Sequence, residues 1–315
     1  MPIVTRRALL GSGVALLGAG AVGGLVRAAP PAEGKLETHK DFPSRFVKAR
    51  TVWIWLPPGY DAGKPLPVLY MHDGQNLFDA KLAGYGVEWG IDEHVSALAK
   101  RGIGPAIVVG IANSPLRWRE YAPASIIKHL SPKTRALIEQ GYGGPPLSAA
   151  YLRFIVEELK PWVDKHYRTR PEQPHTLMMG SSMGGLITLE AMATYPNVFS
   201  GAGCLSSHLS LFAVGAKGPV DPAPWAKDIE AALRAFARED LPPPEHHRFW
   251  LDHGTLSLDQ YYGPFQDALV AGMVKRGYRR GQDLVARTYP GATHNEASWS
   301  ARVEQPLTFL LGGKT

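Results

Sequence analysis

The 315-residue sequence contains a single cysteine, Cys204, so no disulfide can form within the chain. Cys204 lies in an apolar run, which predicts a buried core residue. The formal net charge is +6, but three of the arginines lie in the first 28 residues and the other basic residues are scattered. Nucleic-acid-binding proteins gather Lys and Arg on one face, so no nucleic-acid partner is predicted. Internal repeats and low-complexity linkers are also absent, which indicates one globular domain, residues 46–315.

The first 28 residues have the features of an export signal. Arg6 and Arg7 precede an uncharged run, Ala8 to Val26, and a small-residue cleavage site follows it. Glycines make this run a poor membrane-spanning helix, although an anchor is the alternative. Twin-arginine export carries folded proteins, which agrees with the lack of a disulfide. We expect a signal peptide at 1–28 that engages the twin-arginine machinery, a tether at 29–45, and a periplasmic or secreted protein.

The rest of the chain alternates between apolar runs of strand length and segments of helical periodicity. The predicted strands are 46–56, 67–71, 106–111, 175–179, 199–205, 248–252 and 284–289. The predicted helices are 89–100, 151–166, 186–195, 225–237, 261–275 and one ending at residue 311. This alternation predicts an α/β fold with a mostly parallel central sheet and helices on both faces. Polar residues that follow the strands should therefore meet at the carboxyl edge of the sheet.

The most informative motif is Gly180-Ser181-Ser182-Met183-Gly184-Gly185, which lies between an apolar strand and a helix-like segment. A serine at a sharp strand-to-helix turn has a strained backbone and points its hydroxyl out of the sheet. Its neighbours must be small because the strand and the helix nearly touch there. The central residue, Ser182, is therefore the predicted nucleophile. Met183 would begin the helix, and its backbone N–H is the predicted donor to an oxyanion.

A serine nucleophile needs a base, and histidine has a pKa suited to that role near neutral pH. His294 follows the last predicted strand, which fits the chain order serine, acid, histidine of hydrolase triads. Two aspartates lie near the end of the penultimate strand, Asp252 and Asp259. Asp252 ends that strand, whereas Asp259 lies beyond the turn at Gly254 and can reach sideways to the histidine. We favour Asp259 as the triad acid and keep Asp252 as the alternative.

The second oxyanion donor is expected in the loop of residues 72–79, which follows the predicted strand at 67–71. Gly74 allows the backbone to turn its amides inward. Gln75 is therefore the predicted second donor, beside Met183.

Two groups of residues resemble metal ligands without the spacing of a metal site. The alternative role of the loop after the 67–71 strand is metal binding, with His72, Asp73 and Asp79 gathered around an ion. His246 and His247 are adjacent, but no third ligand stands at a suitable spacing, so a solvated pair is predicted. We expect no metal and no cofactor.

A long segment, residues 113–148, interrupts the alternation of strands and helices. Segments of this length in a compact domain are typical of lids or binding loops, so a lid-like insertion that sets substrate choice is predicted. Arg117 lies in it and follows a strand at the reactive edge. Arg117 either contacts the substrate or pairs with Glu120 to brace the loop.

Together these motifs resemble the putative-esterase family of α/β hydrolases, which includes siderophore, feruloyl and acetyl-xylan esterases and mycolyltransferases. The matching segments are 70–79, 117–123, 180–185, 252–255 and 294–296 with Trp299. The resemblance implies an α/β-hydrolase fold, Ser182 as nucleophile, His294 as base and an acid in the loop after Gly254-Thr255. It also implies that Arg117 faces the substrate, as an arginine does in siderophore-esterase relatives.

The expected function is that of an exported serine carboxylic-ester hydrolase acting on a small-molecule ester through an acyl-enzyme. An acyltransferase of the mycolyltransferase type would use the same residues, with an alcohol in place of water. A non-catalytic binding module on the same fold is the third possibility. A complete Ser-Asp-His set argues against it.

Overall fold

The computed structural model describes residues 34–60, 63–212 and 222–312. The predicted signal peptide and the first part of the predicted tether lie outside these residues. Within them, no helix has the length and the apolar character needed to cross a bilayer.

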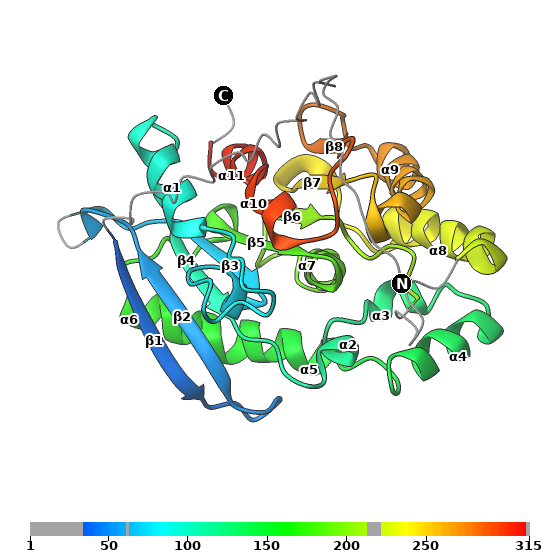
Figure 1. The fold of residues 1–315 in the computed structure, drawn as a ribbon, viewed down its shortest axis with the longest axis horizontal. Coiled ribbons are helices and arrows are strands. Elements are labelled where there is room, and N and C mark those ends of the chain that lie inside the picture. Colours follow the sequence, from blue (N-terminus) through cyan, green and yellow to red (C-terminus); the bar gives the residue numbers. More distant parts are fainter. Residues whose placement is uncertain (1–33, 61–62, 213–221, 313–315) are drawn as a thin grey trace, which may run out of the picture. The chain divides into compact units, whose positions relative to one another are not determined.

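Eight strands form one sheet in the order β1-β2-β4-β3-β5-β6-β7-β8 (Figure 1). Their bounds are β1(Lys35–Phe42), β2(Arg50–Leu56), β3(Val68–His72), β4(Ile107–Ile111), β5(Thr176–Ser181), β6(Gly201–Leu205), β7(Arg248–His253) and β8(Leu284–Thr288). Strand β2 is antiparallel to both β1 and β4, and the other neighbours are parallel. The predicted mostly parallel α/β sheet is therefore confirmed.

Strand β1 corrects the prediction of a tether at residues 29–45. Its sequence is rich in charged and polar residues, and most of its side chains are exposed or half-buried because it is the edge strand. The strand forms because its backbone pairs with β2, from Lys35 opposite Leu56 to Phe42 opposite Arg50. Pairing across a sheet edge leaves no apolar pattern in the sequence, which is why this strand was missed.

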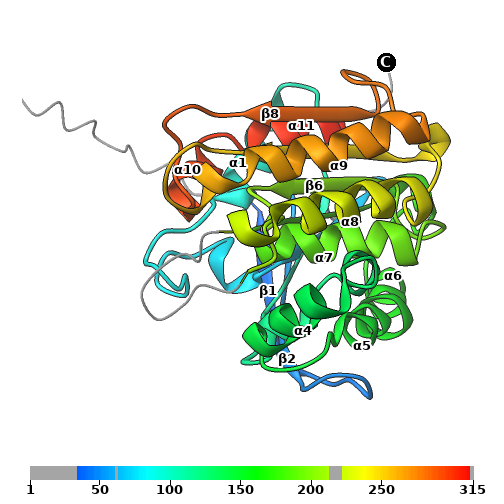
Figure 2. The ribbon, with the colours of Figure 1, turned by 90° about the vertical axis from the view of Figure 1, so that its right-hand side faces the viewer.

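Helices cover both faces of the sheet (Figures 1 and 2). They are α1(Ile91–Lys100), α2(Arg117–Glu120), α3(Ala124–Ile127), α4(Pro132–Gly141), α5(Ser148–Arg153), α6(Lys160–His166), α7(Met183–Thr194), α8(Ala226–Glu239), α9(Gly263–Arg276), α10(Glu296–Ser300) and α11(Glu304–Leu311). A π-helical stretch, η3(Phe154–Leu159), joins α5 to α6.

Alternate residues of the central strands build two separate cores. Leu69 and Met71 of β3 belong to the core shared with α1 and α11, whereas Tyr70 belongs to the larger core beneath α5 to α9. Cys204 is fully buried in the larger core, as predicted. Both faces of the sheet are thus packed against helices and shielded from water. Reactive side chains therefore gather at the ends of the strands.

The inserted segment 113–148 folds as the helices α2, α3 and α4, and it packs into the larger core. Four of its buried side chains are Tyr121, Ile126, Ile138 and Tyr142. This packing distinguishes the segment from an open flap, because lifting it would expose core residues to water.

Candidate active site

Ser182 lies between β5 and α7 with φ 56° and ψ −123°, a backbone conformation that side chains rarely adopt. Only glycine fits at the flanking positions, because a side chain there would clash with neighbouring atoms. A Cβ at Gly180 would stand 2.8 Å from the carbonyl carbon of Gly184, and one at Gly185 would collide with Ser207. The amide of Ser182 donates to the carbonyl of Leu205 on β6 at 3.0 Å, which fixes the turn. The local geometry is that of a nucleophile elbow.

The two residues predicted to supply oxyanion donors, Met183 and Gln75, both follow the carboxyl ends of strands. Met183 begins α7, where the first N–H groups of a helix have no intrahelical acceptor. Gln75 lies in a short 3₁₀ helix, η2(Gly74–Asn76), which begins one residue after β3 ends. A Cβ at Gly74 would stand 2.5 Å from the carbonyl carbon of Gly110 on β4, so only glycine lets η2 lie this close to the sheet.

His294 and Asp259 are brought together, and Asp252 is not their partner. The Nδ1 of His294 lies 2.6 Å from Oδ1 of Asp259, which belongs to the 3₁₀ helix η7(Ser257–Tyr261). Asp259 is fully buried and also accepts hydrogen bonds from the amide of Gly254 and the hydroxyl of Ser206, each at 2.6 Å. Burial raises the pKa of Asp259, but the hydrogen bonds from His294, Ser206 and the amide of Gly254 lower it by more, so the net pKa is lowered and the carboxylate stays ionised.

Asp252 has a different set of partners. Arg302 donates to its Oδ1 from Nη2 at 2.9 Å and from Nε at 3.1 Å, and the indole of Trp250 donates to Oδ2 at 2.8 Å. Both Asp252 and Arg302 are buried. Asp252 therefore ties the turn between α10 and α11, which carries Arg302, to the end of β7.

Ser206, which the sequence analysis missed, links these two aspartates. Its hydroxyl donates to Asp259 and accepts from Nη2 of Arg302 at 2.8 Å and from the indole of Trp299 at 3.0 Å. Its backbone is strained, with φ 42°. No motif marks this residue, because a serine directly after an apolar strand is common.

A cleft of about 1020 Å³ opens at this edge of the sheet. Ser182, His294, Gln75 and Arg117 all line it, whereas Met183 and Asp259 lie fully buried beneath it. Of the inserted segment 113–148, Asn113 and Arg117 reach the cleft. Tyr85 also lines the cleft, and this residue, which lies between two glycines, is 82% exposed.

Arg117 does not pair with Glu120, so that alternative is wrong. Its Nε and Nη2 donate to the two oxygens of Asp73 at 2.7 and 2.8 Å, and Asn113 donates to the same carboxylate at 2.7 Å. Glu120 is instead buried against Arg50, at 2.8 Å. Burial would lower the pKa of Arg117, but Asp73 raises it, and Arg117 in turn holds the pKa of Asp73 below its usual value. Both groups are charged.

The residues considered as metal ligands have other partners. Nδ1 of His72 lies 2.9 Å from the hydroxyl of Tyr151, and burial lowers the pKa of His72 to about 3, so it is neutral. Asp73 is held by Arg117. His247 is buried and bonded to the carbonyls of Pro243 and Pro196, so the predicted solvated pair is wrong for this residue, while His246 is exposed. In the described part of the chain, no three such residues are placed to hold an ion.

The arrangement of the sheet and of the Ser182 turn defines an α/β-hydrolase fold. Solved structures agree: an IroE-like serine hydrolase from Shewanella oneidensis matches 89% of this chain and 80% of its own, with a TM-score of 0.59 and 22% identity. An enterobactin esterase from Shigella flexneri matches 90% of this chain and 61% of its own, with a TM-score of 0.59 and 18% identity.

The chain belongs to the putative esterase family, whose model matches residues 44–310. The Bacillus subtilis protein YbbA, whose function is unassigned, is 28% identical over 179 residues, 55% of this chain and 60% of that protein. The ferri-bacillibactin esterase of the same organism is 27% identical over 45% of this chain and 46% of its own. The chain thus aligns with about half to three-fifths of these relatives. Family membership confirms the predicted resemblance.

Proposed function

We propose that this chain is a serine carboxylic-ester hydrolase with Ser182 as nucleophile, His294 as base and Asp259 as the acid. The observation that carries the proposal is the 2.6 Å contact between His294 and Asp259, at a cleft that Ser182 also lines. An ionised Asp259 holds Nδ1 of His294 protonated, which leaves Nε2 unprotonated and able to accept the serine proton.

In the proposed reaction, the Ser182 hydroxyl attacks the ester carbonyl and passes its proton to His294. The amides of Met183 and Gln75 stabilise the negative charge that develops on the carbonyl oxygen. His294 then protonates the departing alcohol, which leaves an acyl group on Ser182. Water, deprotonated by His294, attacks this acyl-enzyme and releases the carboxylic acid and the free serine.

A fluorophosphonate probe tests the nucleophile directly. We expect one equivalent of label on Ser182, found by peptide mass spectrometry, and no label on the Ser182→Ala variant. A folded wild-type protein that takes up no label would support a non-catalytic module instead. The same reagent cannot separate a hydrolase from an acyltransferase, so ester turnover is also followed in the presence of glycerol and trehalose. Free acid as the main product supports hydrolysis.

The proposed substrate is a small-molecule ester with a bulky or anionic acyl or alcohol part. Two observations support this. The cleft is larger than a short acyl chain needs, and its lining includes the charged Arg117 and the exposed ring of Tyr85. A panel of siderophore, feruloyl, acetyl-sugar and short p-nitrophenyl esters, ranked by kcat/KM, tests it.

Export by the twin-arginine route is part of the proposal, and it is supported by Arg6 and Arg7 ahead of a glycine-rich apolar run. Replacing both arginines with lysine should leave the precursor in the cytoplasm, as measured by cell fractionation. The mature wild-type protein should begin near Ala29. Unchanged export of the double-lysine variant, or a mature protein that keeps residues 1–28, would contradict it.

A further inference from the structure

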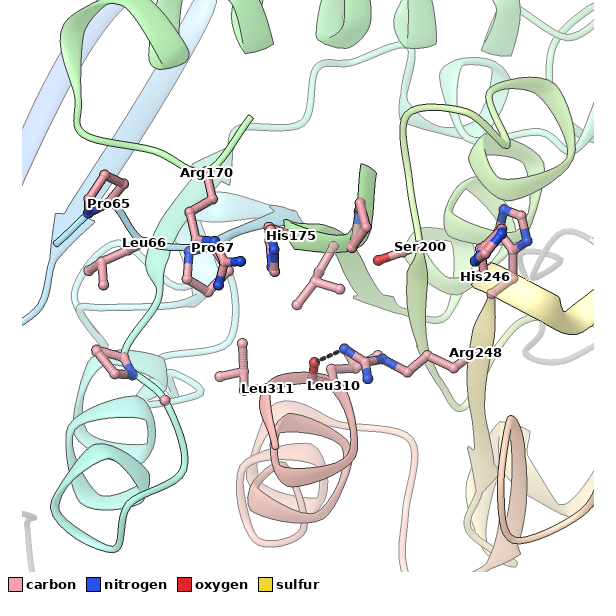
Figure 3. A pocket seen from close by; sticks show the side chains of 15 residues that line it. Pro65, Leu66, Pro67, Arg170, His175, Ser200, His246, Arg248, Leu310 and Leu311 are labelled. Atoms are coloured by element: carbon pink, nitrogen blue, oxygen red, sulfur yellow. Dashed lines mark hydrogen bonds between the residues drawn. The ribbon is translucent and has the colours of Figure 1, made fainter. Parts of the chain in front are cut away.

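A second cavity, of about 530 Å³, lies at the opposite edge of the sheet (Figure 3). Its walls come from the residues that begin the strands: Leu66 before β3, His175 before β5, Ser200 before β6 and Arg248 at the start of β7. The cleft with Ser182 follows the carboxyl ends of the same strands. The two cavities are therefore separated by the length of the sheet.

The cavity combines an apolar surface with positive charge. Leu177, Leu310 and Leu311 supply apolar surface, together with four prolines. Arg248 and His175 lie among them, and the exposed Arg170 and His246 also line the space. No acidic side chain lines it in the part of the chain that the structure describes. An anion that enters thus meets positive charge without a competing carboxylate in the wall.

Among the residues that the structure describes, two buried polar groups in this wall have no hydrogen-bond partner. The hydroxyl of Ser200 is unpartnered although the residue is only 5% exposed, and the hydroxyl points into the cavity in Figure 3. The Nε of Arg248 is also unpartnered, while its Nη2 donates to the carbonyl of Leu310 at 2.6 Å. The two residues are neighbours, because the amide of Arg248 donates to the carbonyl of Ser200 at 2.9 Å. Buried polar groups are normally satisfied, so two adjacent exceptions in one cavity indicate a missing ligand.

We infer that this cavity binds a small amphipathic carboxylate, with its oxygens on Arg248 and Ser200 and its apolar body against the leucines. A carboxylate has two acceptor oxygens, which matches one guanidinium N–H and one hydroxyl. The volume lies within the range of small-molecule sites and exceeds what an inorganic ion needs. The inference is independent of the proposed esterase activity, because no residue of the Ser182 cleft takes part.

Hexanoate is a suitable probe, with acetate and 1-hexanol as the matched compounds that lack its apolar body or its charge. Binding is read locally from the imidazole resonances of His175 and His246, which line the cavity, and globally by calorimetry. We expect saturable shifts of these two resonances with hexanoate, and affinities at least about tenfold weaker with acetate and with 1-hexanol. Equal binding of acetate and hexanoate, or no shift at either histidine, would overturn the inference.

Three variants locate the site. Arg248→Met should weaken hexanoate binding by about tenfold or more, the loss expected for a charge-assisted hydrogen bond. Gly104→Phe should abolish it by filling the cavity, since a Cβ at Gly104 meets only the carbonyl oxygen of Leu311, at 3.8 Å. Arg234→Met, on the exposed side of α8, is the matched control and should bind as the wild type does.

Because Arg248→Met removes a half-buried charge, its melting temperature is measured in parallel. If that variant does not fold, Gly104→Phe and the exposed Arg170→Ala decide the question. Hexanoate binding that survives in folded Gly104→Phe and Arg170→Ala variants would overturn the inference.

Discussion

At the carboxyl edge of the sheet, the buried carboxylates of Asp259 and Asp73 have hydrogen-bond donors, whereas at the amino edge two buried polar groups have no partner among the described residues. Asp259 accepts from three donors, and Asp73 is held by Arg117 and Asn113. At the other end of the same strands, Ser200 and Arg248 each keep an unused polar group.

The two edges also differ in backbone conformation. Asp73, Ser182 and Ser206 have positive φ values, and all three directly follow parallel strands. Ser200 and Arg248, which precede or begin strands, have no such strain. Backbone strain that surrounding hydrogen bonds hold in place fixes reacting groups in one geometry. Unused donors beside an apolar wall leave a place for a ligand instead. One sheet can thus support two kinds of site.

The largest expected effect tests whether the carboxyl edge is catalytic at all. Ser182→Ala should lower kcat for ester hydrolysis by at least about a thousandfold, because it removes the nucleophile and leaves the oxyanion donors in place. Ser96→Ala, a buried serine on α1, is the control and should hydrolyse as the wild type does. A folded Ser182→Ala protein that retains more than a tenth of the activity would contradict the assignment of Ser182 as the nucleophile.

A second prediction separates the two buried aspartates by the property each one affects. Asp259→Asn should lower kcat by about 10³- to 10⁴-fold, because asparagine cannot hold the His294 tautomer. Asp252→Asn should mainly lower stability, by about 3–5 kcal/mol, because Arg302 is then left buried without its counter-ion. Kinetics and denaturant unfolding are measured on both. Greater damage to kcat from Asp252→Asn, at unchanged stability, would mean that the acid has been assigned to the wrong residue.

These predictions depend on a site of which the sequence reveals only part. Ser182, His294 and the glycines around the turn are recognisable because the elbow requires small residues at fixed spacings. The parallel sheet is likewise predictable, since strands buried on both faces are continuously apolar. Strand β1 is not, because an exposed edge strand is defined by its pairing partner and not by its own pattern.

The supporting contacts of the site could not be predicted for a related reason. Arg117 and Asp73 are 44 residues apart, and Ser206 and Arg302 are 96 apart. Only the folded sheet brings these strand ends together. A local pattern suggested Glu120 as the partner of Arg117 because it lies three residues away, but the buried Arg50 takes that carboxylate. Long-range ion pairs leave no periodic signal in a sequence.

Glu190 provides a third case, a buried carboxylate on α7 away from both edges of the sheet. Among the described residues its hydrogen bonds come from the amide and the hydroxyl of Ser125. Burial raises the pKa of Glu190 from 4.5 to about 7. The folded state therefore holds this proton more tightly than the unfolded state, and stability should fall as pH rises from about 4.5 to about 7. Glu190→Gln should remove that fall and stabilise the protein at pH 8 by on the order of 2 to 3 kcal/mol.

The measurement for Glu190 is denaturant unfolding at pH 5 and pH 8. The variant and the wild type should be close in stability at pH 5, where the glutamic acid is mostly protonated in the folded protein. They should separate at pH 8. A Glu190→Gln variant that is less stable at both pH values would show that the carboxylate is satisfied as an ion, like those at the carboxyl edge.

The smallest expected effect concerns Arg117, which is both part of the hydrogen-bonded carboxyl edge and part of the cleft wall. Arg117→Ala should lower kcat/KM for bulky or anionic esters by about tenfold, the loss expected for a charge-assisted hydrogen bond to the remote part of a substrate. Hydrolysis of p-nitrophenyl acetate, which has no such part, should change little.

The pair with Asp73 provides the control for that measurement. Removing Arg117 alone leaves the Asp73 carboxylate buried without its counter-ion, so Arg117→Ala should also lower the melting temperature. The double variant Arg117→Ala with Asp73→Asn removes this unpaired buried charge. It should regain stability without regaining kcat/KM on anionic esters. If the double variant instead recovers activity on every ester together with its stability, Arg117 acts by bracing the loop against Asp73 and does not contact the substrate. The carboxyl edge would then owe its substrate choice to other residues of the cleft.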